Sequence, residues 1–262
     1  MGKIISIVNQ KGGVGKTTTV INLAASLNKL EYKVLVVDMD PQGNASSGCG
    51  IEKNKVSNTI YDYLIGNIGI KDIIYKTPIE KFDIIPANMN LAGADIELSN
   101  QIKREFLLSK GLEEIKDNYD FIIIDCPPAV NLLTINSLTA SDSVIIPMQC
   151  EYYALEGISQ LMQTIKLIKG KTNKDLALEG ILFTMHDSRT NLSRQVIEEV
   201  KKYFSKYVYE TKITRSVRLS EAPSYGVSCI TYAPNSKSSK QYMEFTKEVL
   251  ERNNKNESKR TR

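Results

Sequence analysis

The chain has 262 residues, of which 42% are hydrophobic and 24% charged, with a formal net charge of +4. These values are ordinary for a globular protein, and they exclude a disordered chain, a coiled coil and a fibrous repeat. The first apolar run soon meets Gly12 and Gly13, so it is too short for a signal peptide or a membrane span. We therefore expect a cytoplasmic protein with one folded domain.

The positive charge is concentrated in the C-terminal part of the chain. Residues 1–185 carry 18 basic and 21 acidic side chains, whereas residues 186–262 carry 16 basic and 9 acidic ones. A basic region of this size suits a polyanion such as DNA, although a solvated basic face explains the charge alone equally well.

Apolar runs of strand length alternate with longer segments of helical period, which predicts a parallel sheet with crossover helices. The predicted strands are residues 4–8, 34–38, 82–87, 121–125, 143–148 and 178–185. The predicted helical segments are residues 18–30, 91–116, 155–168 and 191–204. The fold class is therefore α/β, with a single doubly wound, mostly parallel sheet flanked by helices. We assign residues 1–251 to this domain and predict that the basic tail, residues 252–262, is disordered because it lacks large apolar side chains.

A glycine-rich loop with the sequence NQKGGVGKTTT directly follows the first predicted strand and precedes the first predicted helix. Its glycines let backbone N–H groups approach a polyphosphate, and the helix presents its positive end to the same anion. Lys16 can then reach the β- and γ-phosphates, and the Thr17 hydroxyl can bind Mg²⁺. The loop departs from the common phosphate-loop pattern, because Gln10 replaces the first glycine and a second lysine, Lys11, lies inside it. A purely structural turn would explain neither lysine.

Aspartates stand at the ends of two predicted strands, where open α/β sheets bind ligands. We predict that Asp125 holds magnesium, directly or through water. Asp38 is a second candidate for the metal, and Asp40 is our candidate for positioning the attacking water. The alternative reading is that Asp38 or Asp40 only caps a turn.

Three segments together resemble the deviant Walker A, Walker A′ and Walker B motifs of ParA-type ATPases. They are KGGVGKTT, DMDPQGN at residues 38–44 and IIIDCPP at residues 122–128. TINSLTASDSVIIPMQCEYYALEG at residues 134–157 and RSVRLSEAPSYG at residues 215–226 resemble the chromosomal Soj branch of that family. The resemblance extends from the first residue to about residue 250, and it implies an ATP- and Mg²⁺-dependent factor that partitions chromosomes or plasmids.

The resemblance also implies roles for individual residues. Lys11 would reach the partner's nucleotide in an ATP-dependent homodimer, Gly12 would allow the two subunits to approach closely, and Asp40 would be tied to hydrolysis. Arg189 and Arg218 match the positions that bind double-stranded DNA without sequence preference, and the segment containing Pro223 matches the loop against the adenine. The full set expected at the nucleotide is Lys11, Gly12, Gly13, Val14, Gly15, Lys16, Thr17, Thr18 and Pro223.

The same resemblance implies partners and a location. A centromere-binding protein of ParB type would stimulate hydrolysis, the DNA-bound dimer would be associated with the nucleoid, and a replication initiator would be a further contact. No membrane partner is expected, because the tail lacks the apolar face of an amphipathic membrane helix. Two other uses of the loop stay open: an iron-protein reductase with a cluster shared by two subunits, and a small-molecule enzyme that phosphorylates a carboxylate or carbamate.

Overall fold

The computed structural model describes residues 2–260 apart from residues 54, 79 and 153. One seven-stranded sheet runs through the molecule in the order β3-β4-β2-β5-β1-β6-β7. The strands, in chain order, are β1 (Lys3–Ile7), β2 (Val34–Asp38), β3 (Tyr75–Lys76), β4 (Asp83–Ile85), β5 (Phe121–Asp125), β6 (Ser143–Gln149) and β7 (Ala177–Thr184). Only the β3–β4 pair is antiparallel; every other neighbouring pair is parallel. The predicted doubly wound, mostly parallel sheet is confirmed.

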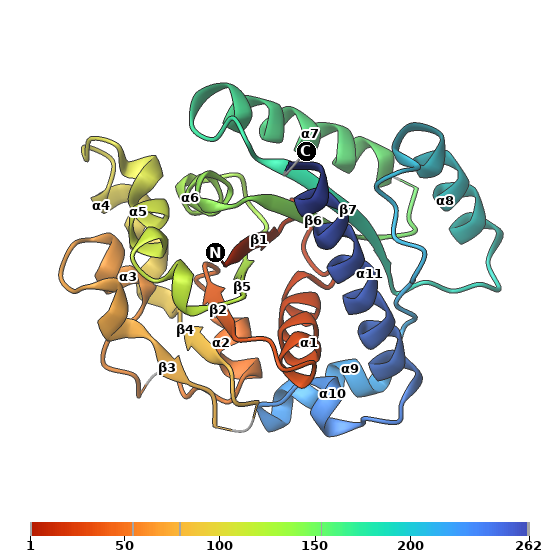
Figure 1. Ribbon diagram of the computed structural model, residues 1–262, viewed down its shortest axis with the longest axis horizontal. Coiled ribbons are helices and arrows are strands. Elements are labelled where there is room, and N and C mark those ends of the chain that lie inside the picture. Colours follow the sequence, from red (N-terminus) through yellow and green to blue (C-terminus); the bar gives the residue numbers. More distant parts are fainter. Residues whose placement is uncertain (1, 54, 79, 153, 261–262) are drawn as a thin grey trace.

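Helices cover both faces of this sheet (Figure 1). The α-helices are α1 (Lys16–Lys29), α2 (Asn44–Gly48), α3 (Ile60–Leu64), α4 (Ala94–Glu97), α5 (Leu107–Glu113), α6 (Leu132–Ala140), α7 (Ala154–Lys171), α8 (Asn191–Phe204), α9 (Val217–Glu221), α10 (Cys229–Tyr232) and α11 (Lys237–Arg260). Short 3₁₀ turns complete the chain at Ile70–Ile73, Met89–Gly93, Arg104–Phe106, Lys116–Asn118 and Ala222–Tyr225.

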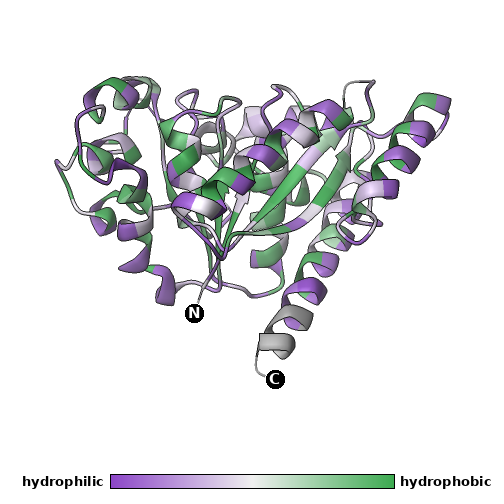
Figure 2. Ribbon diagram, turned by 90° about the horizontal axis from the view of Figure 1, so that it is seen from above, coloured by the Kyte–Doolittle hydropathy of each residue, from purple (hydrophilic) through white to green (hydrophobic). Residues whose placement is uncertain are grey.

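The sheet is apolar on both faces because it is buried between two helical layers, as parallel sheets generally are. On one face, Ile5, Ile7 and Val36 pack with the apolar stripes of α1 and α11. On the other face, Ile4 and Val37 join a larger core with α3 and α5 to α8. Figure 2 shows the result, with hydrophobic strands inside and helices that turn their polar sides outward.

Two departures from the predicted segments exceed a shift of a few residues at an element's end. Residues 91–116 do not form one helix but a series of short helices and 3₁₀ turns, since Lys103 adopts a left-handed backbone conformation with φ = 59° and interrupts the segment. Helix α11 continues beyond residue 251, where we placed the domain boundary, to Arg260. The boundary itself stays a prediction. Within the part of the chain that is described, no helix is long and apolar enough to cross a membrane.

Candidate nucleotide-binding site

The glycine-rich loop occupies residues 8–15, between β1 in the centre of the sheet and the N-terminus of α1. Gly13 and Gly15 have φ values of 74° and 86°, a region that side chains with a Cβ rarely enter. No side chain caps the N-terminus of α1, so its first N–H groups are available to an anion. This is the geometry that polyphosphate binding requires.

Side chains from the carboxyl ends of β6 and β7 hold this loop in place. Gln149 Nε2 donates a hydrogen bond to the carbonyl oxygen of Gly13 at 2.7 Å, and Thr184 Oγ1 donates to that of Val14 at 2.8 Å. Asn9 reinforces the start of the loop, because its Oδ1 accepts the Lys11 N–H at 2.9 Å. Because the Gly13 and Val14 carbonyl oxygens accept these hydrogen bonds, the conformation of the loop is fixed without a nucleotide.

The two lysines of the loop lie in different environments. Lys16 is 7% exposed and its Nζ donates to the carbonyl oxygen of Lys11 at 3.1 Å. Burial lowers the pKa of Lys16, although the nearby carboxylate of Asp125 acts in the opposite direction. Lys11 points outward instead, where its ammonium group forms an ion pair with Glu151 just after β6. Lys16 is therefore enclosed by the loop, whereas Lys11 lies at its outer side.

Asp125 and Thr17 form a compact polar pair beside the loop. Thr17 Oγ1 donates a hydrogen bond to Asp125 Oδ2 at 2.7 Å. The other carboxylate oxygen of Asp125 is fully buried and has no hydrogen-bond partner among the described residues. Because an unpartnered buried carboxylate oxygen is costly, it suits a cation, and Mg²⁺ is typically held by one or two carboxylates together with substrate phosphates. The residues present therefore fit a magnesium ion.

Asp38 lies beside Asp125, since the two residues are register partners in the adjacent strands β2 and β5. Its carboxylate already accepts three hydrogen bonds, from the N–H groups of Asp40 and Ser46 and from the Ser46 hydroxyl. Burial raises the pKa of Asp38 to about 6, and burial together with the charge of Asp38 also raises the pKa of Asp125. Asp38 thus organises the turn after β2, and its predicted contact with the metal stays untested.

Asp40 lies on that turn at the same edge of the sheet and is 8% exposed. Its Oδ1 accepts the Gln42 N–H at 2.9 Å. Gly12, at the outer side of the loop, has free space around it: a Cβ built there would meet no described atom within 4 Å. Its own chain therefore gives no steric reason for glycine at this position.

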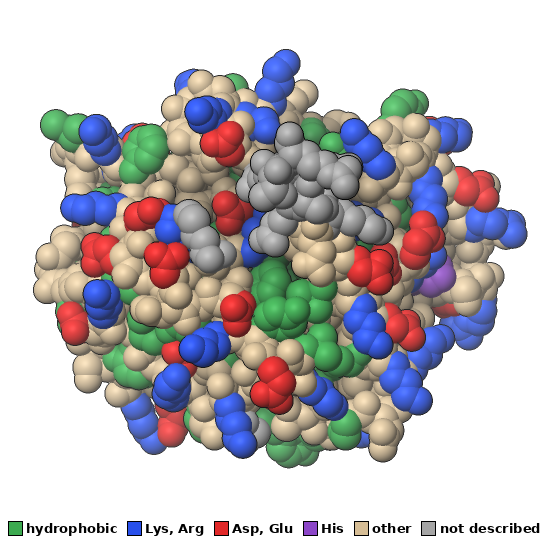
Figure 3. Space-filling view, in the orientation of Figure 1, with side chains coloured by type: hydrophobic (Ala, Val, Ile, Leu, Met, Phe, Trp, Pro, Cys, Tyr) green, Lys and Arg blue, Asp and Glu red, His purple; other side chains and the backbone are tan. Residues whose placement is uncertain are grey.

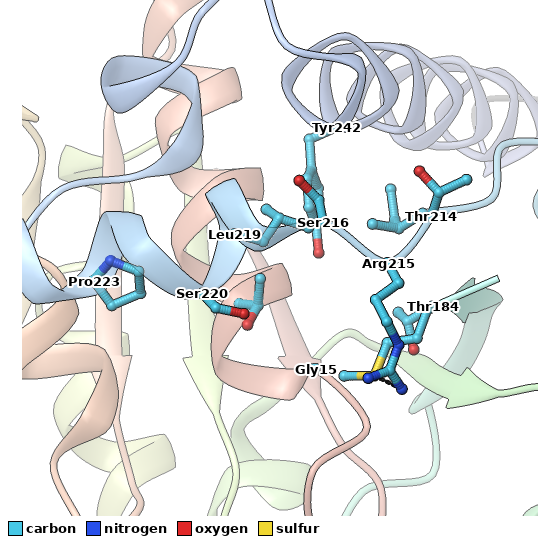
Figure 4. A pocket seen from close by; sticks show the side chains of 12 residues that line it. Gly15, Thr184, Thr214, Arg215, Ser216, Leu219, Ser220, Pro223 and Tyr242 are labelled. Atoms are coloured by element: carbon cyan, nitrogen blue, oxygen red, sulfur yellow. Dashed lines mark hydrogen bonds between the residues drawn. The ribbon is translucent and has the colours of Figure 1, made fainter. Parts of the chain in front are cut away.

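A cavity opens beside the loop, between α1, the end of β7 and the segment that leads into α9 (Figure 4). It is lined by Thr18 and Pro223, which both belong to the set predicted at the nucleotide. Leu219, Ile213 and Tyr242 supply further apolar surface, and the Tyr242 hydroxyl is 3.3 Å from that of Thr19. The cavity is of the kind that accepts the ring system of a nucleotide.

The two arginines predicted to bind DNA lie on the surface and are not among the residues that line this cavity. Arg189 precedes α8, is 88% exposed and pairs with Asp187 at 2.7 Å. Arg218 lies in α9, is 57% exposed and pairs with Glu221 at 2.9 Å. On the face of the molecule shown in Figure 3, basic side chains are interspersed with acidic ones rather than gathered in one patch. Exposed pairs of this kind contribute little to stability, so both guanidinium groups are available to another anion.

Sequence reasoning missed the residues that hold the loop from outside. Gln149 and Thr184 come from strands far away in the chain, and only the sheet order brings them to the loop. Their one sequence signal was their position at the ends of predicted strands.

The sheet, the glycine loop and the Thr17–Asp125 pair define a P-loop nucleotide-binding protein. Residues 2–178 match the family model described as AAA domain. The chain is 59% identical to the sporulation initiation inhibitor protein Soj of Bacillus subtilis, an alignment that covers 95% of this chain and 98% of that one. It is 52% identical to the chromosome partitioning protein ParA of Myxococcus xanthus, over 96% of this chain and 89% of that protein. The chain belongs to the ParA/Soj family of partitioning ATPases, which confirms the resemblance seen in the sequence.

Solved structures give the same fold. One from Mycobacterium smegmatis, named as a cobyrinic acid a,c-diamide synthase with bound ADP and magnesium, has a TM-score of 0.84 and 36% identity and covers 95% of this chain and 94% of that one. A putative plasmid partition protein from Borrelia burgdorferi, bound to AMPPNP, has a TM-score of 0.80 and 28% identity over 98% of this chain and 100% of that one. The predicted fold class is thereby confirmed a second time.

Proposed function

We propose that this chain is a DNA-partitioning ATPase whose ATP-bound homodimer binds DNA without sequence preference and is released by hydrolysis. One observation carries the proposal. The chain aligns over nearly its whole length with Soj and ParA proteins, and its fold brings four polar residues to the same edge of the sheet: Lys16, Thr17, Asp40 and Asp125. These are the groups that phosphoryl transfer to water needs.

Binding of ATP uses the organised loop. The N–H groups of the loop and of the α1 N-terminus surround the phosphates, and the Lys16 ammonium group neutralises their charge. Thr17 and Asp125 would hold Mg²⁺, which would help to neutralise the charge of the phosphates. The buried position of Lys16 strengthens its attraction for the phosphates, because little water screens it there.

Hydrolysis requires a positioned water and a second cation. We assign the first task to Asp40, whose carboxylate can accept a proton from the attacking water. We assign the second to Lys11 of the opposite subunit, because in its own chain Lys11 is directed outward to Glu151. A cation supplied in trans couples hydrolysis to assembly, and the open space at Gly12 suits the close approach of a partner.

Arg189 and Arg218 are the proposed DNA contacts. Both are exposed, both lie in the basic C-terminal part of the chain, and arginine pairs well with phosphate. A ParB-type centromere-binding protein would stimulate hydrolysis, and the DNA-bound dimer would be cytoplasmic and nucleoid-associated. A replication initiator is a further proposed contact.

The rate of ATP hydrolysis with and without partners tests this function. The purified chain should hydrolyse ATP slowly alone, and faster when nonspecific duplex DNA and the ParB-type protein from the same genome are added together. An unstimulated rate in all combinations would contradict the proposal. Phosphorylation of a small carboxylic acid, or the diamide synthesis named for the Mycobacterium smegmatis structure, would replace it with a metabolic role.

A further inference from the structure

Arg215 is the only positively charged side chain among the described residues that line the cavity beside the loop. It stands on the segment before α9, and its side chain extends toward Gly15 and Thr184 (Figure 4). Neither the resemblance nor the motifs assign it a role. Unlike Arg189 and Arg218, it forms no ion pair with any carboxylate in the described part of the chain. The guanidinium group of Arg215 is therefore available to a ligand in the cavity.

Among the described residues the Arg215 side chain forms one polar contact, with Met185: the Arg215 Nη2 atom lies 3.8 Å from the Met185 sulfur. Met185 is itself unusual, because its φ of 50° places a residue with a long side chain in the left-handed region. Such strained conformations concentrate at ligand sites and functional turns. The Gln149 Nε2 atom lies 2.9 Å from the same sulfur, and it also donates to the Gly13 carbonyl oxygen. The strained residue thus links the side chain of Arg215 to the phosphate loop.

The composition of the cavity wall indicates which part of a nucleotide this arginine would meet. Apart from Arg215, the wall consists of apolar and hydroxyl side chains, among them Leu219, Pro223 and Tyr242. In the proposed function the phosphates already have Lys16 and the loop N–H groups as partners. A planar guanidinium group packs well against an aromatic ring, and a thioether below it is a soft, polarizable support.

We propose that Arg215, held by Met185, packs its guanidinium plane against the purine base of the bound nucleotide and so contributes to ATP affinity. This inference rests on the proposed function, since it takes the nucleotide of that function as the ligand. It adds a residue that senses the base and connects it, through Met185 and Gln149, to the loop that binds the phosphates.

Calorimetric titration with two ligands, Mg·ATP and Mg·tripolyphosphate, tests the proposal because only the first has a base. Arg215→Ala should weaken ATP binding by between about twofold and thirtyfold, the range for a cation above an aromatic ring, and leave tripolyphosphate binding unchanged. Arg215→Lys should also weaken ATP binding, because an ammonium group keeps the charge but not the plane. Arg194→Ala, which removes an exposed arginine of α8, is the matched control and should bind both ligands like the wild type.

Three results would overturn the inference or separate it from the function beneath it. Wild-type affinity of Arg215→Ala for ATP would remove Arg215 from the site. Equal weakening for both ligands, restored by Arg215→Lys, would assign Arg215 to the phosphates instead of the base. If the wild type itself does not bind ATP, and Lys16→Ala behaves like the wild type in this titration, the result contradicts the proposed function and not only this inference.

Discussion

Lys11 and Glu151 form an ion pair within one chain, at the rim of the phosphate loop. The lysine belongs to the loop and the glutamate follows β6, so the contact closes over the outer side of the site. If Lys11 serves the nucleotide of a partner subunit, as we propose, this pair must break when the dimer forms. Both side chains are about half exposed, with side-chain values of 55% and 45%, so breaking the pair costs at most about 1 kcal/mol.

Glu151→Gln is therefore expected to favour assembly. Because each dimer contains two such pairs, the protein concentration for half-maximal dimerisation in ATP should fall by up to about thirtyfold, the equivalent of about 2 kcal/mol. Analytical ultracentrifugation over a range of protein concentrations measures this shift. Glu156→Gln, in the first turn of α7, is the control and should dimerise like the wild type. Weaker dimerisation of Glu151→Gln would show that the glutamate serves the dimer rather than the free subunit.

Removal of the Thr17 hydroxyl should weaken nucleotide binding only when magnesium is present. Thr17→Ala loses the hydrogen bond to Asp125 and one ligand of the proposed metal site. Since hydrogen bonds to charged groups contribute about 1.5–3 kcal/mol, Mg·ATP affinity should fall by at least about tenfold. Thr17→Ser keeps the hydroxyl and should restore most of it. Titration with ATP in Mg²⁺ and in EDTA checks this, and an equal loss in both conditions would argue against the metal site.

Asp40→Ala should separate binding from hydrolysis. The carboxylate lies outside the phosphate loop, so ATP affinity and dimerisation should remain, while the hydrolysis rate falls about 10²-fold or more. Because Asp40 also supports the turn through Gln42, Asp40→Asn is the informative partner variant: it keeps an oxygen for that N–H but cannot accept the proton. Steady-state phosphate release measures both. Normal hydrolysis by Asp40→Asn would show that this residue does not activate the water.

Arg218→Ala should retain ATP-dependent dimerisation but bind duplex DNA less tightly. Each phosphate contact that is lost should reduce the slope of log affinity against log salt by about 0.9. Arg189→Ala should have the same effect. Fluorescence anisotropy with labelled nonspecific duplex at several salt concentrations gives this slope. Arg104→Ala, in the acidic N-terminal part of the chain, is the control. An unchanged slope for both variants would exclude these arginines as DNA contacts.

The sequence predicted the sheet well because its strands are continuous apolar runs. The predicted bounds for β2 and β5 coincide with the observed ones, and so do those of α8. Strand β3 was missed because it is only two residues long. Helix α11 was also missed, although Tyr242, Phe245 and Val249 form a buried stripe at helical spacing, because its average composition is strongly polar.

The site was predictable where a local motif carries the chemistry, and not where the tertiary structure supplies it. Lys16, Thr17 and the glycines follow each other in the chain, so their spacing alone indicates phosphate binding. Gln149 and Thr184 bond to the same loop but lie more than a hundred positions away from it in the chain. No local sequence pattern distinguishes them from other residues at strand ends. The outward direction of Lys11 likewise needed the structure, because it depends on Glu151.

Retention on nonspecific duplex DNA, measured with no nucleotide, ADP, ATP and a slowly hydrolysed ATP analogue at two salt concentrations, tests the central claim most directly. Molecular size is followed in the same samples. The account predicts salt-sensitive retention together with dimerisation, and only with ATP or its analogue. Dimerisation without DNA retention, or retention that ignores the nucleotide, would contradict it.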